Sequence, residues 1–301
     1  MSRDIRSYRG SIAPLPTPYT EKGDFDEASF RRIVEHHLDN GTHGLSCTGT
    51  SGEPSNLTRE ERVYVIKTLV DQVNKRVPVI AGTGTNNYEE TLYFTQQAEQ
   101  LGADGVLVIV PYYVRPSQEA LYQYYTSIAS KIDIPLIIYN IPGRTAIDLE
   151  PHTMKRIRMK CENVIGVKES NKNFEHINEV FHVVGRDFLV FSGIETLCFP
   201  LMALGGAGHI SATANLVPRE VADIFNLTEA GEWEKARDLH FKLVEINDAI
   251  FYETNPGPLK TMLEMMGMIR ADIRLPLTQP SPEVKARLKQ VLLNYGLIPK
   301  A

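Results

Sequence analysis

Short apolar stretches alternate with longer amphipathic segments along most of this chain of 301 residues. Gly, Pro or Asn bounds each apolar stretch, and eight occur, at residues 11–19, 44–49, 78–84, 105–113, 135–142, 164–170, 188–194 and 205–213. The segments between them carry apolar residues at spacings of three and four, with acidic residues near their starts, as amphipathic helices do. Near-continuous apolar runs are typical of parallel strands buried on both faces. The pattern therefore predicts strands joined by helices in right-handed crossovers.

Eight strand-and-helix units within the first 215 residues favour a closed (β/α)8 TIM barrel over an open sheet. After Asn215 the strand pattern ends, and helical patterns follow at residues 232–253 and 281–296. No linker rich in Gly and Ser separates the two parts. We expect a barrel domain over residues 1–215, with its active site at the C-terminal ends of the strands. Residues 216–301 are expected to form a helical C-terminal domain that packs on the barrel.

The stretch VIGVKES places Lys168 at the end of an apolar strand, although lysine is among the residues least often buried. Desolvation would lower the pKa of this lysine and leave a nucleophilic amine, which can form an imine with a carbonyl substrate. Proton transfers around an imine suit a tyrosine hydroxyl linked to a threonine hydroxyl. The structural alternative for Lys168 is a salt bridge at the barrel rim with Glu169 or Glu53.

Composition narrows the class of protein without changing this prediction. The chain is 43% hydrophobic and 23% charged, with a formal net charge of -5 and a pI near 5.9. No basic stripe is present to attract nucleic acid, and no apolar run approaches the length of a membrane span. The N-terminus has charges where a secretory signal needs apolar residues, so we expect a cytoplasmic protein. The three cysteines lack paired spacing and are expected to be reduced.

Metal and nucleotide sites are not indicated. The glycine-rich stretches GTGTNN and GGAGHI do not have the spacing of dinucleotide or phosphate-binding loops, so no cofactor is expected. His36, His37 and His43 are close in sequence, but a solvated helix face explains them better than a metal site. The strand ends supply no set of three His, Asp or Glu ligands, which disfavours a metal-dependent aldolase.

The motifs GTSGE, PYY, YNIPGRT and GVKES occur in this order, and with them the chain resembles the dihydrodipicolinate synthase and N-acetylneuraminate lyase family. The resemblance runs from about Gly10 to the C-terminal helices. It implies a (β/α)8 barrel with a helical C-terminal domain and a homotetramer built as a dimer of dimers. It also implies that Lys168 condenses with pyruvate or a related 2-oxo acid.

The resemblance implies roles for further residues. Tyr139 of YNIPGRT would move protons around the imine, joined by Thr50 and by Tyr113, which in the family reaches across a dimer interface. Donors at Thr50 and Ser51 would hold the pyruvate carboxylate, and many relatives have two threonines there. The backbone at two further positions would line the same pocket, Gly193 and Ile210.

Arg144 indicates which second substrate is used. It matches an arginine that, in dihydrodipicolinate synthases, binds the carboxylate of aspartate semialdehyde. A guanidinium there favours a carboxylated aldehyde as the partner of pyruvate, so the resemblance favours a synthase that condenses pyruvate with aspartate semialdehyde. The stretches KNFEHINEV and GRDFLVFSGIETLC also resemble an aldolase subgroup that cleaves a hydroxylated 2-oxo dicarboxylate to pyruvate and a semialdehyde. A third possibility is a non-catalytic barrel that binds a small molecule, because fold does not guarantee function.

Overall fold

The computed structural model describes residues 4–299 and contains eight strands that close into a barrel in sequence order. Seven of the predicted apolar stretches contain a whole strand, and the first contains β1 except for its first residue, Gly10, so the predicted TIM barrel is confirmed. The strands are β1 (Gly10–Pro14), β2 (Gly44–Cys47), β3 (Val79–Gly82), β4 (Gly105–Ile109), β5 (Leu136–Asn140), β6 (Val164–Glu169), β7 (Leu189–Ser192) and β8 (Gly208–Ile210).

The chain divides into two compact units, Met1–Gly10 with Pro78–Ile210 and Ser11–Val77 with Ser211–Ala301. The predicted division into residues 1–215 and 216–301 groups the chain by type of element and stays a prediction. Its outer ends, residues 1–3 and 300–301, lie outside the described part of the chain.

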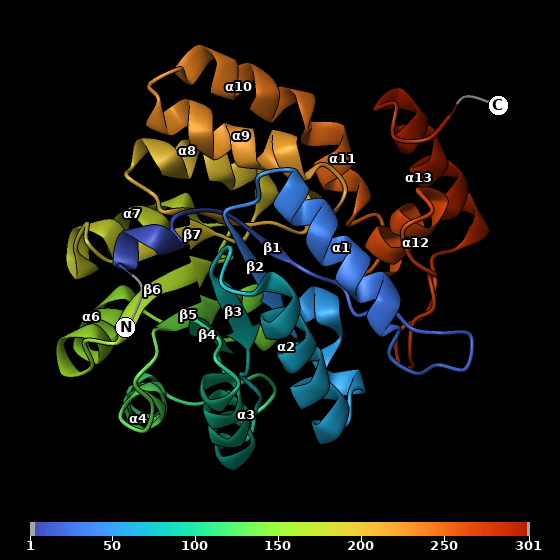
Figure 1. Ribbon diagram of the computed structural model, residues 1–301. Helices are drawn as coiled ribbons and strands as arrows, with labels where there is room; N and C mark the ends of the chain where they lie inside the picture. Colours follow the sequence, from blue (N-terminus) through green and yellow to red (C-terminus); the bar gives the residue numbers. More distant parts are fainter. Residues whose placement is uncertain (1–3, 300–301) are drawn as a thin grey trace. The chain divides into compact units, whose positions relative to one another are not determined.

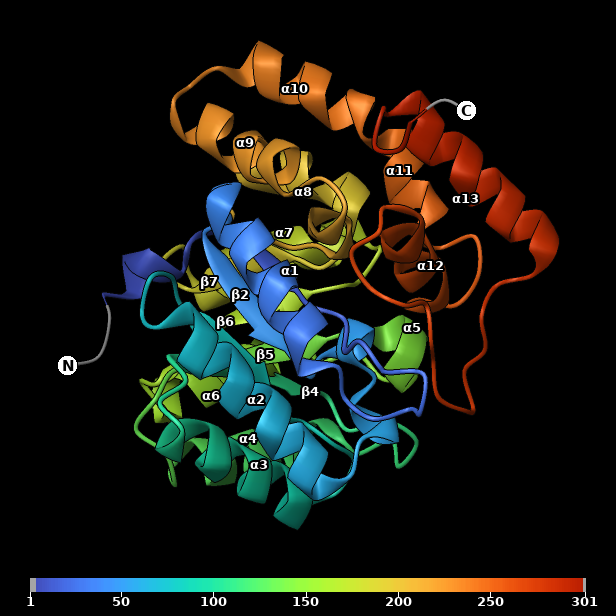
Figure 2. The same ribbon diagram turned by 45° about the vertical axis from the view of Figure 1, so that its right-hand side comes forward.

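The first unit contains β3 to β8, and its strands pair in parallel with consecutive neighbours. Helices α3, α4 and α6 lie on the outer side of β3 to β6 (Figures 1 and 2). Asn87 and Ser117 cap the N-termini of α3 and α4 with their side chains, as short polar residues do. The helices of this unit are η1 (Ile5–Tyr8), α3 (Tyr88–Gln100), α4 (Gln118–Ala129), α5 (Pro142–Thr145), α6 (Pro151–Lys160), α7 (Phe174–Val184), η4 (Glu195–Leu197) and α8 (Cys198–Ala203).

The second unit pairs β1 with β2 in parallel and contains the predicted C-terminal helices. Thr58 and Glu61 form a capping box at the start of α2, and α9 lies beside α10 in both views (Figures 1 and 2). Its helices are α1 (Glu27–Asp39), η2 (Thr50–Gly52), η3 (Pro54–Asn56), α2 (Arg59–Val73), η5 (Ala212–Asn215), α9 (Pro218–Glu229), α10 (Trp233–Lys242), α11 (Val244–Ala249), α12 (Gly257–Met265) and α13 (Pro282–Asn294).

The strands are buried almost throughout, as their apolar sequences predict. All six residues of β6 are buried, and β5 is buried over its whole length. Alternate side chains of a strand point to opposite faces of the sheet, so adjacent positions can serve different purposes. None of the helices among residues 4–299 is long and apolar enough to cross a membrane.

Gly166 lets β6 and β7 approach closely, and this generates a prediction for stability. A Cβ atom at Gly166 would lie 2.3 Å from the carbonyl oxygen of Leu189, so the backbone of β7 would have to move. Gly166→Ala is expected to lower the free energy of unfolding by about 1–3 kcal/mol, the usual cost of overpacking. Gly143→Ala is the control, because a Cβ there meets nothing within 4 Å. Equal urea midpoints for the two variants would contradict this prediction.

Candidate active site

Lys168 lies near the end of β6 with its side chain almost fully buried, 6% exposed. Its neighbour across the sheet is Tyr139 of β5, which is 5% exposed. The Nζ atom of Lys168 lies 4.2 Å from the centre of the Tyr139 ring, a distance that permits cation–π attraction. The structure thus brings together the two residues that the sequence predicts as nucleophile and proton carrier.

Neither glutamate of the alternative salt bridge pairs with Lys168. Glu169 bonds to other side chains of its own unit, and Glu53 forms an ion pair with Lys260 at 2.6 Å. Within residues 4–299, Lys168 has no carboxylate partner. The amine is therefore held among groups that do not neutralise it, which leaves the structural alternative without support.

Gly193 follows β7 and lies directly against Lys168. A Cβ atom at this position would lie 2.9 Å from Cε of Lys168 and 1.9 Å from Oγ of Ser170. The backbone N–H of Gly193 donates to the carbonyl of Glu169 at 2.7 Å, which fixes the end of β7 beside β6. A residue without a side chain is thus required where Lys168 passes. The side chain of Lys168 therefore passes close to Gly193, one of the predicted pocket residues.

A polar cluster that includes the buried Asn140 and Glu169 occupies the positions that follow the two candidate catalytic residues. Asn140 follows Tyr139 and Glu169 follows Lys168, and these two are also paired across the sheet. Nδ2 of Asn140 lies 3.0 Å from Oε1 of Glu169 and 2.6 Å from Oδ1 of Asp148. This amide therefore ties the C-terminal ends of β5 and β6 together. Because strand residues alternate between faces, the cluster fixes both ends from the face opposite Lys168 and Tyr139.

His176 of α7 completes this cluster. Its Nε2 lies 3.3 Å from Oε2 of Glu169, and its Nδ1 lies 3.5 Å from Oδ2 of Asp148. Burial lowers the pKa of His176, but the hydrogen bond to Glu169 and the negative charges of Glu169 and Asp148 outweigh burial and raise it overall. Burial raises the pKa of Glu169, while its contacts with His176 and Asn140 act in the opposite direction without cancelling this rise.

Thr50 and Ser51 form the start of η2, directly after β2 and in the second unit. Ser51 is 3% exposed, and Oγ1 of Thr17 donates to the carbonyl of Gly52 at 2.8 Å. Glu53 ends this turn with a left-handed backbone at φ 52° and ψ 48°, a conformation that costs a non-glycine residue about 1 kcal/mol or more. Strong contacts to this turn must therefore hold it in this conformation.

Those contacts come from a buried ion pair. Nζ of Lys260 lies 2.6 Å from Oε1 of Glu53, and neither side chain has any exposed surface. Lys260 also donates to the carbonyl of Asp272 at 2.7 Å, and its Nζ lies 4.2 Å from the centre of the Tyr19 ring. Burial lowers the pKa of Lys260, and the Glu53 carboxylate opposes that shift. Breaking one partner of such a pair would leave an uncompensated buried charge.

The remaining predicted residues lie at or after strand ends, and in the described part of the chain none of them forms a hydrogen bond or ion pair with Lys168. Ile210 ends β8 and is buried. Arg144 lies in α5, directly after β5, with its side chain exposed. Tyr113 follows β4, is 88% exposed and has a left-handed backbone with φ 74°. Their predicted roles stay predictions.

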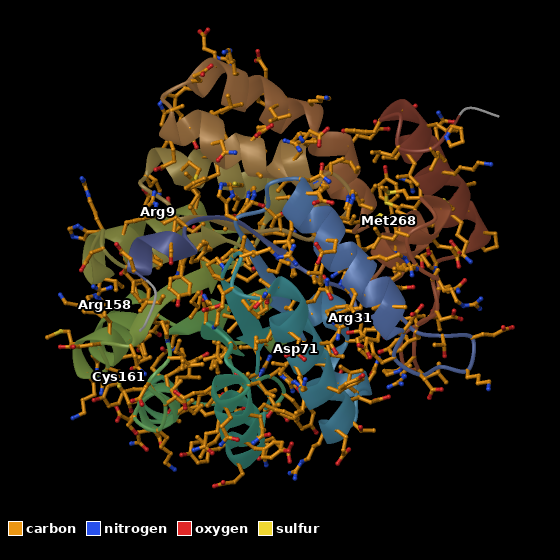
Figure 3. The ribbon with its side chains drawn as sticks, in the orientation of Figure 1. Arg9, Arg31, Asp71, Arg158, Cys161 and Met268 are labelled. Atoms are coloured by element: carbon orange, nitrogen blue, oxygen red, sulfur yellow. The ribbon has the colours of Figure 1, made fainter. Side chains whose placement is uncertain are left out.

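The buried cysteines offer no reactive thiolate. All three are free, and Cys161 directly follows α6 (Figure 3). Burial raises the pKa of Cys47 to about 12, and burial also raises the pKa of Cys161 and Cys198. Because the thiolate is the nucleophilic form, these side chains behave as core residues at neutral pH.

Two of the three histidines near α1, His37 and His43, have hydrogen-bond partners other than a metal. The expectation of a solvated face is wrong for His37, which is fully buried with its Nε2 at 3.3 Å from Oδ1 of Asn215. His43 contacts the backbone N–H of Ser11 and Oδ1 of Asn226. Among residues 4–299, no group of three His, Cys, Asp or Glu side chains is placed to hold a metal ion.

Comparison with known proteins adds to this geometry. A sequence model described as the dihydrodipicolinate synthetase family matches residues 7–294. A 4-hydroxy-tetrahydrodipicolinate synthase from Thermus thermophilus is 49% identical over 294 residues, which are 97% of this chain and 98% of that protein. The crystal structure of dihydrodipicolinate synthase from Aquifex aeolicus has a TM-score of 0.95 and 42% identity, covering 97% of this chain and all of that one.

A further similar structure is described as the first monomeric dihydrodipicolinate synthase variant. Its TM-score is 0.95 with 37% identity, and the match covers 98% of this chain and 99% of that one. The fold is thus shared with a structure that is described as monomeric.

The contacts of His176 predict how the free energy of unfolding depends on pH. The pKa of His176 in the folded protein lies above its unfolded value of about 6.5, so the folded state holds the proton more tightly. The resulting stabilisation is fully present below the unfolded pKa and is lost as pH rises through the folded pKa. We expect His176→Gln to lower the free energy of unfolding more near pH 6 than near pH 9, measured by urea unfolding.

His152→Gln serves as the matched control, because His152 is 76% exposed and lies 3.9 Å from Glu179. This variant is expected to change the unfolding free energy little at either pH. A His176→Gln effect that is equal at both pH values would show that the protonated histidine does not stabilise the cluster.

Proposed function

The chain belongs to the dihydrodipicolinate synthetase family, and on that premise we propose that it condenses pyruvate with aspartate semialdehyde through an imine on Lys168. The observation that carries this proposal is the buried Lys168 amine, with its Nζ 4.2 Å from the centre of the Tyr139 ring and no carboxylate beside it in the described chain. A buried amine of this kind is suited to attack a carbonyl carbon.

The chemistry follows from the imine. Nζ of Lys168 attacks the ketone carbon of pyruvate, and water leaves as the protonated imine forms. This imine withdraws electrons, so a proton leaves the methyl group and the resulting enamine attacks the aldehyde carbon of the second substrate. The amino group of that substrate then attacks the imine carbon and displaces Lys168, which closes the ring and frees the enzyme. One water molecule is released overall.

Tyr139 is proposed to carry protons during these steps, with Thr50 and Tyr113 completing the relay. The proximity of the Tyr139 ring to Nζ supports the first role. The resemblance in sequence supports the other two, since Thr50 and Tyr113 each follow the C-terminal end of a barrel strand.

Two sites are proposed for substrate carboxylates. Donors at Thr50 and Ser51 hold the carboxylate of pyruvate, and the backbone at Gly193 and Ile210 lines the same pocket. The contact of Gly193 with the Lys168 side chain supports its part in this pocket. Arg144 is proposed to bind the carboxylate of aspartate semialdehyde, because a guanidinium can donate two parallel hydrogen bonds to it.

The proposed assembly is a homotetramer, a dimer of dimers, in the cytoplasm. The 88% exposure of Tyr113 supports a partner subunit, since a tyrosine of the relay would be shielded from water by a neighbour. The buried, unpaired cysteines are consistent with a reducing compartment. Neither nucleic acid nor membrane is proposed as a partner.

The proposal predicts that Lys168→Ala lowers turnover of pyruvate and aspartate semialdehyde by at least about a thousandfold, because removal of a nucleophile leaves only residual catalysis. Product formation in a steady-state assay is the measurement. Lys172→Ala is the matched control, since Lys172 is exposed four residues along the chain.

Wild-type protein that cleaves a hydroxylated 2-oxo dicarboxylate but does not condense the two substrates would favour the aldolase alternative. Thermal stabilisation by pyruvate without any turnover would favour the binding barrel.

For Tyr139→Phe we expect turnover to fall by about a hundredfold or more, because a proton carrier is lost while the ring packing is kept. Imine formation with pyruvate should be slowed and not abolished, since the Lys168 amine remains. Rapid-quench kinetics of the first turnover measures both steps. Full turnover in this variant would remove Tyr139 from the relay.

A further inference from the structure

Asn255 makes a contact with Ser51 that the mechanism above does not use. Nδ2 of Asn255 donates to Oγ of Ser51 at 3.2 Å, and the two residues are 5% and 3% exposed. Ser51 lies in η2 and Asn255 stands just before α12, 204 residues away in sequence but in the same unit. A buried side-chain contact thus joins the proposed carboxylate site to the C-terminal segment.

The two segments in contact are fixed relative to each other. Lys260, on α12, forms the buried ion pair with Glu53 at the end of the same turn as Ser51. The backbone N–H of Arg274 donates to Oε2 of Glu53 at 3.3 Å, and the Arg274 guanidinium pairs with Glu61 at 2.6 Å. Because these contacts tie the turn to the C-terminal segment, they hold Asn255 beside Ser51.

Because Asn255 donates this hydrogen bond, the Ser51 hydroxyl accepts it, and this affects what the hydroxyl can donate to. A serine hydroxyl has one hydrogen to donate and two lone pairs that accept, whereas a carboxylate only accepts. We propose that Asn255 is a positioning residue: by donating to Ser51 Oγ, it occupies a lone pair and leaves the Ser51 hydrogen to donate to the carboxylate of pyruvate. This inference rests on the proposed function, which places that carboxylate at Thr50 and Ser51.

The Asn255 side chain uses only its Nδ2 group in a hydrogen bond, which supports a role in positioning Ser51. Oδ1 of Asn255 is buried and has no hydrogen-bond partner among residues 4–299. A buried amide that serves packing alone usually has partners for both its ends. The bond that Asn255 does make is to the hydroxyl, and a hydroxyl that accepts one hydrogen bond is a stronger donor in the next.

Asn255→Asp is the most direct test, because it keeps the shape of the side chain and replaces the donor by an acceptor. The Ser51 hydroxyl would then donate to the introduced carboxylate in place of pyruvate. We expect the KM for pyruvate to rise about tenfold, the effect of losing one hydrogen bond to a charged group, with kcat changed less than about threefold. A variant that only lost part of its folded population would show a lower kcat and an unchanged KM.

The Ser51→Ala variant distinguishes an effect of Asn255→Asp on the Ser51 hydroxyl from repulsion between the new carboxylate and the carboxylate of pyruvate. In a Ser51→Ala background there is no hydroxyl to turn, so adding Asn255→Asp should change the KM for pyruvate less than about twofold. The same tenfold rise in both backgrounds would assign the effect to the new charge or to a distorted turn and would overturn the proposal. Asn178→Asp makes the same chemical change on the exposed surface of α7 and should leave the KM unchanged.

The outcomes distinguish this inference from the proposed function. Wild-type protein that does not turn over pyruvate at all would contradict the proposed function, and the inference with it. Wild-type turnover together with an unchanged KM in Asn255→Asp would contradict the inference alone.

Discussion

A lysine amine buried at the end of an apolar strand is the constraint on which the rest of this site depends. Removing an ammonium group from water costs several kcal/mol unless a partner compensates. The face of the Tyr139 ring contributes about 0.5–2 kcal/mol of attraction, which is smaller than that cost. A chain that keeps Lys168 here therefore tolerates an unfavourable burial of the amine, which the proposed imine chemistry would explain.

Successive positions on β5 and β6 have different roles in the surrounding structure. Tyr139 and Lys168 are neighbours across β5 and β6, and the next pair along, Asn140 and Glu169, belongs to the polar cluster with His176. The cluster ties the strand ends together without placing a carboxylate on the amine. In the second unit, the ion pair of Glu53 and Lys260 likewise fixes the turn that contains Thr50 and Ser51. Both candidate sites are thus held by buried polar contacts and not by loops alone.

The fold and the central lysine could be predicted because their signals are local. Each strand is a short apolar run, and Lys168 is conspicuous within one of them. The supporting contacts could not be predicted, since they join residues far apart: Glu53 and Lys260 are separated by 207 positions, and Ser51 and Asn255 by 204. Sequence reasoning offered Glu169 and Glu53 as partners of Lys168, but each is engaged elsewhere. The burial of His37 was missed because neighbouring histidines at a helix end also fit a solvated face.

The central claim is that Lys168 forms an imine with pyruvate. The most direct measurement is to incubate the purified protein with pyruvate, reduce it with borohydride and map the modified peptide by mass spectrometry. The account predicts a stable adduct of pyruvate on Lys168 and on no other lysine. Folded protein without an adduct, or with one on a different lysine, would contradict it.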